Sequence, residues 1–511
     1  MSKITFMDAT NGFPDHNLDP KLRKYAHEIF DIAQDYGLTS FPIKFQLVSP
    51  RELNAIAAYD GFTSRIPHWS YGMEFENIHK RYSYGQSKIY ELVINTNPVL
   101  AWLLNTNTLM DQKLVMIHVC GHADFFFNNC WFENTDRYML DQMANNASRV
   151  RRYMSRIGEA RVESFIDVCF SLNNLIDPYL AHIKRQRPKM EEEDFEKAIP
   201  VPKLKANSYM DKYINTEEFI ELQKQKMRAE REKRKRFPEE PTRDILGFLI
   251  DHAPLEKWQR NILGMVREES YYFAPQMMTK IMNEGWATHI HSMMMTTRLA
   301  TSGEIIDYCD SQSRAIQQGN SINPYRLGMQ LFRNIEERWN KGQFGKEWEE
   351  CRDLEKKSNW DLKLGLGKDK IFQVRRTHND LTFLDEFLTP EFCEEHQLYS
   401  WKPNEYNPDY QDIEREFGKV KDSFLKALSN GGQPVIEIDN ANYENKGELK
   451  LTHVHDGREL DPKKANDTLE NLFKLWTRPI HIETIEVDDS GQSTPILWTY
   501  NGEEHIKAVL Q

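Results

Sequence analysis

The sequence predicts an α+β protein, with a mainly helical body that contains a few strands and a small C-terminal α+β domain. Up to about residue 400, most segments carry apolar residues at helical spacing. From about residue 430, strand-like runs bounded by turn residues surround one helix. A chain of 511 residues is long enough for two or three domains. We therefore expect a body over residues 1–404 and a second domain over residues 405–511.

In the N-terminal part, helices are predicted to alternate with two strands. The first helix runs from about Pro20 to Gly37, because Leu22, Tyr25 and Ile29 fall on one stripe. The elements that follow are a strand in 41–50, a short helix over 51–58, an irregular aromatic segment over 59–73, a strand over 90–95, a further helical stretch, and helices over 114–129, 135–157 and 159–172.

The middle of the chain differs in kind, since residues 185–241 are polar and residues 222–236 are dense in lysine and arginine. We interpret this stretch as an exposed, basic insertion, and favour a solvated helical arm over a nucleic-acid contact. Compact elements then resume as helices near 258–267, 281–299 and 324–339, and another helix starts at Thr389-Pro390. The C-terminal domain is predicted as a helix over 412–428, strands in 434–443 and 447–455, a helix over 463–476, and strands in 479–487 and 496–510.

Composition limits the classes of protein to consider. The 66 basic and 78 acidic residues give a net charge of −12, which argues against a general nucleic-acid or anionic-membrane binder. No segment approaches the roughly 18 uncharged apolar residues of a membrane helix, and the first residues contain no apolar signal core. The six cysteines form no C-x-x-C pair. These features predict a cytoplasmic protein with reduced thiols, no transmembrane segment and no specific nucleic-acid partner.

Two histidines stand out in the almost wholly apolar segment LVMIHVCGHADFFFNN, residues 114–129. In a helix, His118 and His122 lie about 40° apart around the axis and one turn from each other. Burial disfavours the charged form of imidazole, which leaves neutral nitrogens able to bind a metal. Two such imidazoles on one helix face are the first half of a helical zinc site.

Glu284 is the natural third ligand, because it lies inside a second apolar helical pattern, IMNEGWAT, residues 281–288. A buried carboxylate needs a cation or hydrogen-bond donors. His291 faces the same way but about 10 Å further along the axis, so we expect it behind the ligands or over the substrate. Two histidines and a glutamate with an open fourth position form a hydrolytic zinc site, in which the ion activates water and polarises a carbonyl.

The general base is the missing part of this site. In H-E-x-x-H the residue after the first histidine is a glutamate, whereas this chain has Val119. A base therefore has to come from elsewhere, and the candidates are His291, Glu163 and Asp124. Glu163 belongs to a carboxylate stripe along the predicted helix 159–172, which is either a solvated face or the acidic wall of a pocket. The spacing alone does not choose among the three.

Several long segments resemble the SpoVR family, the stage V sporulation protein R group of bacteria. The resemblance is carried by PHWSYGMEF (67–75), YELVINTNP (90–98), HVCGHADFFFNN (118–129), MNEGWAT (282–288), INPYRLGMQLF (322–332), HNDLTFLDEFL (378–388) and GELKLTHVHDGRELD (447–461). It implies a cytoplasmic protein linked to spore cortex formation, with a serine protein kinase and a von Willebrand A-like protein as partners. It also implies a peptidoglycan-derived substrate, since an amide hydrolase acting on peptidoglycan is one activity suggested for the family.

A shorter segment, Asn283 to Ala287, resembles the N-E-G-F-A and E-G-W-A contexts of the third zinc ligand in gluzincin metallopeptidases. This resemblance implies a metallopeptidase-like body in which His118, His122 and Glu284 bind Zn²⁺. The chain departs from the gluzincin pattern at Val119. The separation between the second histidine and the glutamate is also longer, and the 185–241 insertion accounts for part of it.

Two hypotheses of different classes follow. The first is a zinc-dependent amide hydrolase, with His291 or Glu163 handling protons. Tyr325 and Arg326 would hold the substrate, unless Tyr325 is packed and Arg326 is paired with a carboxylate. The alternative is a non-catalytic scaffold or regulatory partner of the kinase and von Willebrand A-like module, in which the histidines form a structural metal site. Val119 is the residue that favours this alternative.

Overall fold

A computed structural model describes residues 18–83, 91–183, 236–317, 322–403, 411–487 and 491–510, with a few positions between 216 and 226. The chain forms two compact units, Met1–Glu163 with Tyr271–Gly432, and Ser164–Ser270 with Gln433–Gln511. The predicted boundary near residue 405 falls inside the first unit. Most of the predicted basic insertion, including most of 222–236, lies outside the described residues.

The first unit contains a three-stranded sheet with the order β1-β3-β2. Strand β3 (Val99–Leu104) is central, parallel to β1 (Ile43–Val48) and antiparallel to β2 (Glu91–Ile94). Every residue of β3 is buried, because both faces of the strand are covered: Val99, Ala101 and Leu103 pack in one hydrophobic cluster, and Leu100, Trp102 and Leu104 pack in another. The prediction of a helical stretch after residue 95 is wrong over β3. A run of six apolar residues has neither strand nor helix periodicity, so the sequence pattern did not separate the two.

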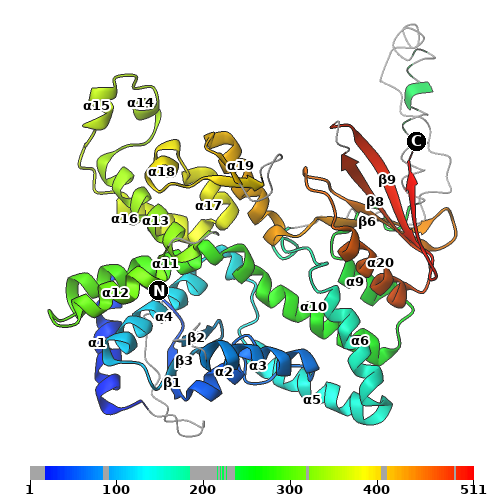
Figure 1. The fold of residues 1–511 in the computed structure, drawn as a ribbon, viewed down its shortest axis with the longest axis horizontal. Helices are drawn as coiled ribbons and strands as arrows, with labels where there is room; N and C mark the ends of the chain where they lie inside the picture. The colour runs from blue at the N-terminus through cyan, green and yellow to red at the C-terminus, as the bar shows by residue number, and fades with distance from the viewer. Residues whose placement is uncertain are drawn as a thin grey trace, which may run out of the picture. The chain divides into compact units, whose positions relative to one another are not determined.

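Helices make up most of the first unit (Figure 1). Its N-terminal half contains α1 (Pro20–Tyr36), α2 (Pro50–Ala58), α3 (Trp69–Ser83), α4 (Leu109–Asn128), a short turn η1 (Cys130–Phe132), α5 (Met139–Ile157) and the start of α6 (Glu159–Ser171). Helix α1 begins after the N-cap Asp19 and ends at Gly37, which has the positive φ of a helix C-cap. The predicted irregular segment 59–73 runs into α3 at Trp69.

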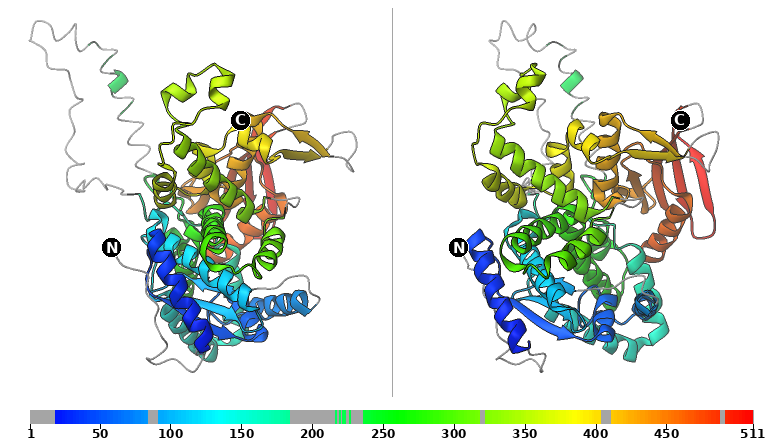
Figure 2. Two further views of the ribbon diagram at one scale, coloured as in Figure 1. Left: turned by 90° about the vertical axis from the view of Figure 1, so that its left-hand side faces the viewer. Right: turned by 60° about the vertical axis from the view of Figure 1, so that its left-hand side comes forward.

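The second half of this unit adds further helices. They are the end of α10 (Lys257–Met278), α11 (Lys280–Met294), η3 (Met295–Leu299), α12 (Ile305–Ala315), α13 (Pro324–Lys341), α14 (Lys346–Glu349), α15 (Leu354–Ser358), α16 (Gly367–Thr377), α17 (Asp380–Phe387), α18 (Pro390–Glu395), α19 (Phe417–Leu428) and η4 (Ser429–Gly432). Strands β4 (Ser400–Pro403) and β5 (Gln411–Glu414) form an antiparallel pair. Figure 2 shows that α14 and α15 project beyond α13 and α16.

The second unit contains a five-stranded sheet with the order β10-β9-β8-β7-β6. Its elements are the rest of α6, α9 (Ile245–His252), the first part of α10, β6 (Ile436–Tyr443), β7 (Glu448–His453), α20 (Pro462–Trp476), β8 (Ile480–Val487), β9 (Ser493–Tyr500) and β10 (His505–Val509). Strands β7 and β8 are parallel because α20 connects them, and the other pairs are antiparallel. The helical body and this sheet confirm the predicted α+β class. Among the described residues, no helix combines the length and apolarity needed to cross a membrane.

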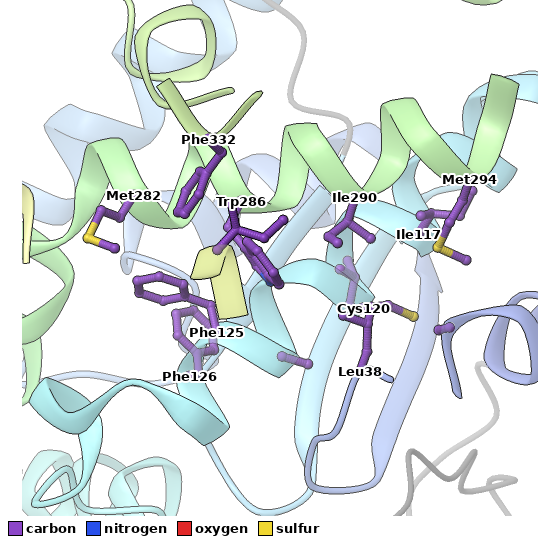
Figure 3. Packing of buried hydrophobic residues seen from close by; sticks show 14 of the residues in the cluster. Leu38, Ile117, Cys120, Phe125, Phe126, Met282, Trp286, Ile290, Met294 and Phe332 are labelled. Atoms are coloured by element: carbon purple, nitrogen blue, oxygen red, sulfur yellow. The ribbon is translucent and has the colours of Figure 1, made fainter. Parts of the chain in front are cut away.

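Helix α11 lies between α4 and α13 in the core of the first unit. Figure 3 shows Ile117 and Cys120 of α4 in one cluster with Trp286 and Ile290 of α11. The helices approach closely because small residues meet at the crossing. A Cβ atom on Gly121 would lie 2.7 Å from the Cα atom of Ala287. This close crossing brings the polar side chains of α4 and α11 together inside an apolar core.

Candidate metal centre

The starts of α4 and α11, the two helices that carry the predicted ligands, are fixed by side chains. The hydroxyl oxygen of Thr108 accepts a hydrogen bond from the backbone N–H of Asp111, and the Asp111 carboxylate reaches back to the N–H of Thr108. At the start of α11, the carboxylate of Asp380 on α17 accepts hydrogen bonds of 2.8 Å from the backbone N–H groups of Ile281 and Met282. These contacts satisfy N–H groups that a helix leaves unpaired, so both helix starts are held in place.

The predicted ligands His118, His122 and Glu284 meet at one point. The Oε2 atom of Glu284 is 3.5 Å from Nε2 of His118 and 3.4 Å from Nε2 of His122. One ligand atom from each residue lies within 4.8 Å of the others, and the described part of the chain contains no other such group of three. Ligands about 2.0–2.1 Å from a tetrahedral zinc ion are roughly 3.4 Å apart, so the two distances to Glu284 fit such an ion.

Glu284 itself also fits a metal ligand. Its Oε2 atom is buried and receives no hydrogen bond from any residue that the structure describes. A buried carboxylate oxygen without a donor is costly unless a cation lies against it.

The second ring nitrogen, Nδ1, contacts a different residue in each of the two histidines. Nδ1 of His122 lies 2.9 Å from Oδ1 of Asn283, an amide oxygen that only accepts hydrogen bonds. His122 therefore donates its Nδ1–H group there, and in a neutral ring its Nε2 is the unprotonated nitrogen that faces Glu284. Nδ1 of His118 lies 2.9 Å from Nδ1 of His291. Burial, followed by the neighbouring His122, lowers the pKa of His118, so its ring is neutral at pH 7.

His291 lies behind His118, which is one of the two positions that the sequence left open. Its Nδ1 faces His118 and its Nε2 lies 2.7 Å from Oε1 of Gln312. Both ring nitrogens are therefore engaged, and neither faces Glu284. Gln312 was not predicted at all, and neither was the contact between Asn283 and His122. Asn283 could have been found because it precedes Glu284, whereas no pattern around Gln312 signals its place.

Asp124, the second candidate base, is fully buried and points away from the histidines, as its offset from His122 predicts. Its carboxylate accepts hydrogen bonds from the backbone N–H of Thr39 at 2.8 Å, from Nε1 of Trp286 at 2.9 Å and from the guanidinium of Arg375. Burial raises the pKa of Asp124, and the hydrogen-bonded Arg375 opposes that rise. Because these hydrogen bonds link α4 to α11 and α16, the role of Asp124 is structural.

The remaining predicted residues differ in their distance from the site. The ring of Tyr325 stacks on that of His118, with centroids 6.2 Å apart and planes 27° apart. Arg326, next along α13, is half-buried, and its backbone N–H donates to the N-cap Asn323. Glu163 is half-buried on α6, and its side chain forms no hydrogen bond or ion pair with another residue of the described ranges. Of the predicted site residues, the structure therefore gathers the three ligands, His291 and Tyr325.

Comparison with family models shows which protein family this chain belongs to. A family model described as SpoVR like protein matches residues 17–433. This chain belongs to the SpoVR family. A second model, the SpoVR-like C-terminal domain, matches residues 434–487. An uncharacterized protein of Escherichia coli strain K12, YcgB, is 28% identical over 507 residues, which cover 93% of this chain and 94% of YcgB. No solved structure matches the chain.

The candidate metal centre lies wholly within the part that matches the SpoVR model. That match ends at residue 433, next to Gly432, where the first compact unit ends. His118, His122, Glu284, His291 and Gln312 all precede this point. The SpoVR resemblance is therefore confirmed, whereas the likeness of Asn283–Ala287 to the gluzincin motif stays a prediction.

Proposed function

We propose that this SpoVR-family chain is a zinc-dependent hydrolase that cleaves an amide bond. One observation carries the proposal: two buried histidine nitrogens and one buried carboxylate oxygen converge with the spacing of ligands around a single ion. His118 and His122 would supply neutral imidazoles, and Glu284 would supply one negative charge. A zinc ion held there would keep a fourth position for water or substrate, lower the pKa of that water and polarise a carbonyl.

The protein residues define what kind of hydrolase this can be. The residue after His118 is the fully buried Val119, so the chain carries no glutamate base at this position. Proton transfer in the proposed reaction therefore follows another route than in H-E-x-x-H peptidases. The stacked Tyr325 lies beside His118, and we propose that Tyr325 and Arg326 help to hold the substrate. The family resemblance supports a peptide amide of peptidoglycan as the substrate, in spore cortex or other cell-wall processes.

Zinc binding by purified full-length protein tests the first part of the proposal. Glu284→Gln removes the negative charge while it keeps the side-chain shape, and His118→Ala removes one nitrogen ligand. His79→Ala, at an exposed position on α3, is the matched control. We expect one zinc ion per wild-type chain and per control chain, and loss of the ion from both site variants with an unchanged circular dichroism spectrum. A wild-type protein that binds no zinc would overturn the proposal.

Hydrolysis is tested separately with peptidoglycan peptides, in the presence and absence of a chelator. Cleavage that the chelator abolishes and zinc restores supports the enzyme. A fully zinc-loaded wild-type protein that cleaves none of a broad set of amide substrates contradicts it.

The alternative function is a non-catalytic scaffold or regulatory partner of a serine protein kinase and a von Willebrand A-like protein. The buried Val119 at the position of the usual base is the observation that favours it. In this case the metal would be structural, and Glu284→Gln would unfold the first unit. Thermal unfolding of the zinc-loaded wild type, the metal-free wild type and Glu284→Gln distinguishes the two functions. A structural metal predicts that both metal-free proteins lose the cooperative unfolding transition of the first unit, whereas a catalytic metal predicts that both keep it.

A further inference from the structure

We propose that Gln312 is a positioning residue that fixes, through His291, which nitrogen of His118 carries the proton. This inference rests on the proposed zinc site and goes beyond it, because Gln312 and His291 would touch neither the ion nor the substrate. The three side chains come from three helices, since His118 lies on α4, His291 on α11 and Gln312 on α12.

The direction of the hydrogen bonds that join His118, His291 and Gln312 follows from the chemistry of the Gln312 side chain. Oε1 of Gln312 accepts hydrogen bonds and cannot donate, so Nε2 of His291 must carry a proton to form the 2.7 Å contact. His291 is 5% exposed, and its two neighbours are an imidazole and an amide, neither of which is an anion. A buried imidazolium between two neutral groups is unfavourable, so His291 is neutral and its Nδ1 carries no proton.

The proton between the two histidines therefore belongs to His118. Nδ1 of His118 must donate across the 2.9 Å contact to Nδ1 of His291. In a neutral ring this leaves Nε2 of His118 unprotonated, 3.5 Å from Oε2 of Glu284. Only an unprotonated nitrogen binds a metal ion, so the Gln312 amide selects the ligand form of His118.

The orientation of the Gln312 amide decides the outcome, and a second contact supports the orientation described. Its Nε2 atom lies 3.8 Å from the sulfur of Met329, a buried residue of α13 that accepts a weak hydrogen bond. The reverse orientation would place the amide NH₂ against Nε2 of His291. The proton pattern would then reverse along the chain, and His118 would present an N–H group to Glu284.

His122 uses a shorter version of the same arrangement. Its Nδ1–H group donates directly to the amide oxygen of Asn283, which in a neutral ring also leaves Nε2 free of a proton. The hydrogen bonds from both ligand histidines thus lead to a neutral amide oxygen. His122 reaches Asn283 directly, and His118 reaches Gln312 through His291. The common result is that both Nε2 atoms are ready to bind before a metal ion arrives.

Zinc affinity of three full-length variants tests this role, measured by competition with a chromophoric chelator. Gln312→Met removes the acceptor at similar size, Gln312→Glu keeps an acceptor, and Gln317→Met changes an exposed glutamine just after α12. We expect Gln312→Met to bind zinc about 10- to 100-fold more weakly, the usual effect of losing a hydrogen-bond partner of a ligand histidine. Gln312→Glu should restore at least wild-type affinity, and Gln317→Met should match the wild type.

Nitrogen NMR of metal-free protein labelled in histidine side chains gives a readout that general loss of packing does not produce. We expect His118 of the wild type to carry its proton on Nδ1, and a mixture of both forms in Gln312→Met. Wild-type His118 protonated on Nε2, or equal zinc affinity in wild type and Gln312→Met, overturns the inference while the zinc site stands. A wild-type protein that binds no zinc overturns both. If Gln312→Met fails to fold, the wild-type spectrum decides.

Discussion

Replacing Gly285 by alanine should separate α11 from α13 and weaken the metal centre at the same time. A Cβ atom at this position would lie 2.4 Å from both the Cα and the carbonyl carbon of Gly328. Non-bonded carbon atoms rest about 3.5–4.0 Å apart, so the two helices must move apart by roughly 1 Å. Overpacking of this kind costs about 1–3 kcal/mol, and the better helix propensity of alanine returns about 1 kcal/mol. We expect a net loss of up to about 2 kcal/mol.

The same displacement reaches the neighbouring residue Glu284. Zinc–ligand distances tolerate only about 0.2 Å, so a shift of α11 by several times that amount should lower zinc affinity at least about tenfold. The control is Gly72→Ala on α3, in the same compact unit, where a Cβ atom meets nothing within 4 Å. That variant should gain about 0.4–1 kcal/mol and bind zinc normally.

Urea unfolding and zinc titration of both variants measure these effects. The reasoning is refuted if Gly285→Ala equals the wild type in stability and zinc affinity while Gly72→Ala behaves as expected.

Three further predictions concern buried charges. Burial raises the pKa of Asp380 to about 7, so its stabilising contribution is complete below about pH 4 and is lost as the pH rises through 7. Urea unfolding between pH 5 and 8 should therefore show a smaller decline in Asp380→Asn than in the wild type, and an equal decline would contradict this. Asp124→Asn leaves the Arg375 charge buried without its anion, and should lower the free energy of unfolding by about 3–5 kcal/mol; a loss below about 1 kcal/mol would argue against the network. Because burial and His122 lower the pKa of His118, zinc affinity should stay constant from pH 8 to about 6.5 and fall only in more acidic solution, and a decline that begins above pH 7 in a competition titration would disagree.

The three proposed ligands can be picked out from the sequence because their pattern is local. His118 and His122 share a helix face by spacing alone, and an anionic side chain inside the apolar pattern around Glu284 has few physical explanations other than a cation. The meeting of the two helices depends on Gly121 and Ala287, which are small residues with many other uses. Their role becomes visible only at the crossing.

Three other features could not be predicted from the sequence, and each has its own physical reason. Strand β3 is apolar at all six positions, because it is covered on both faces, and an unbroken apolar run carries no periodicity. Gln312 acquires its role from the packing of α12 beside α4, a contact that no sequence spacing encodes. His291 was placed on the correct side of α11, but its position behind His118 required the distances between ring nitrogens.

The carboxylate of Asp380 belongs to α17 but holds the start of a different helix, α11. It grips the first turn of α11 from a residue almost a hundred positions later in the chain, one turn before the proposed glutamate ligand. The position of Glu284 along the axis of α11 therefore depends on a contact with α17. A relative that keeps both histidines but lacks a hydrogen-bond acceptor at position 380 should bind a metal ion weakly. A search for functional members of the family would accordingly gain from reading position 380 together with 118, 122 and 284.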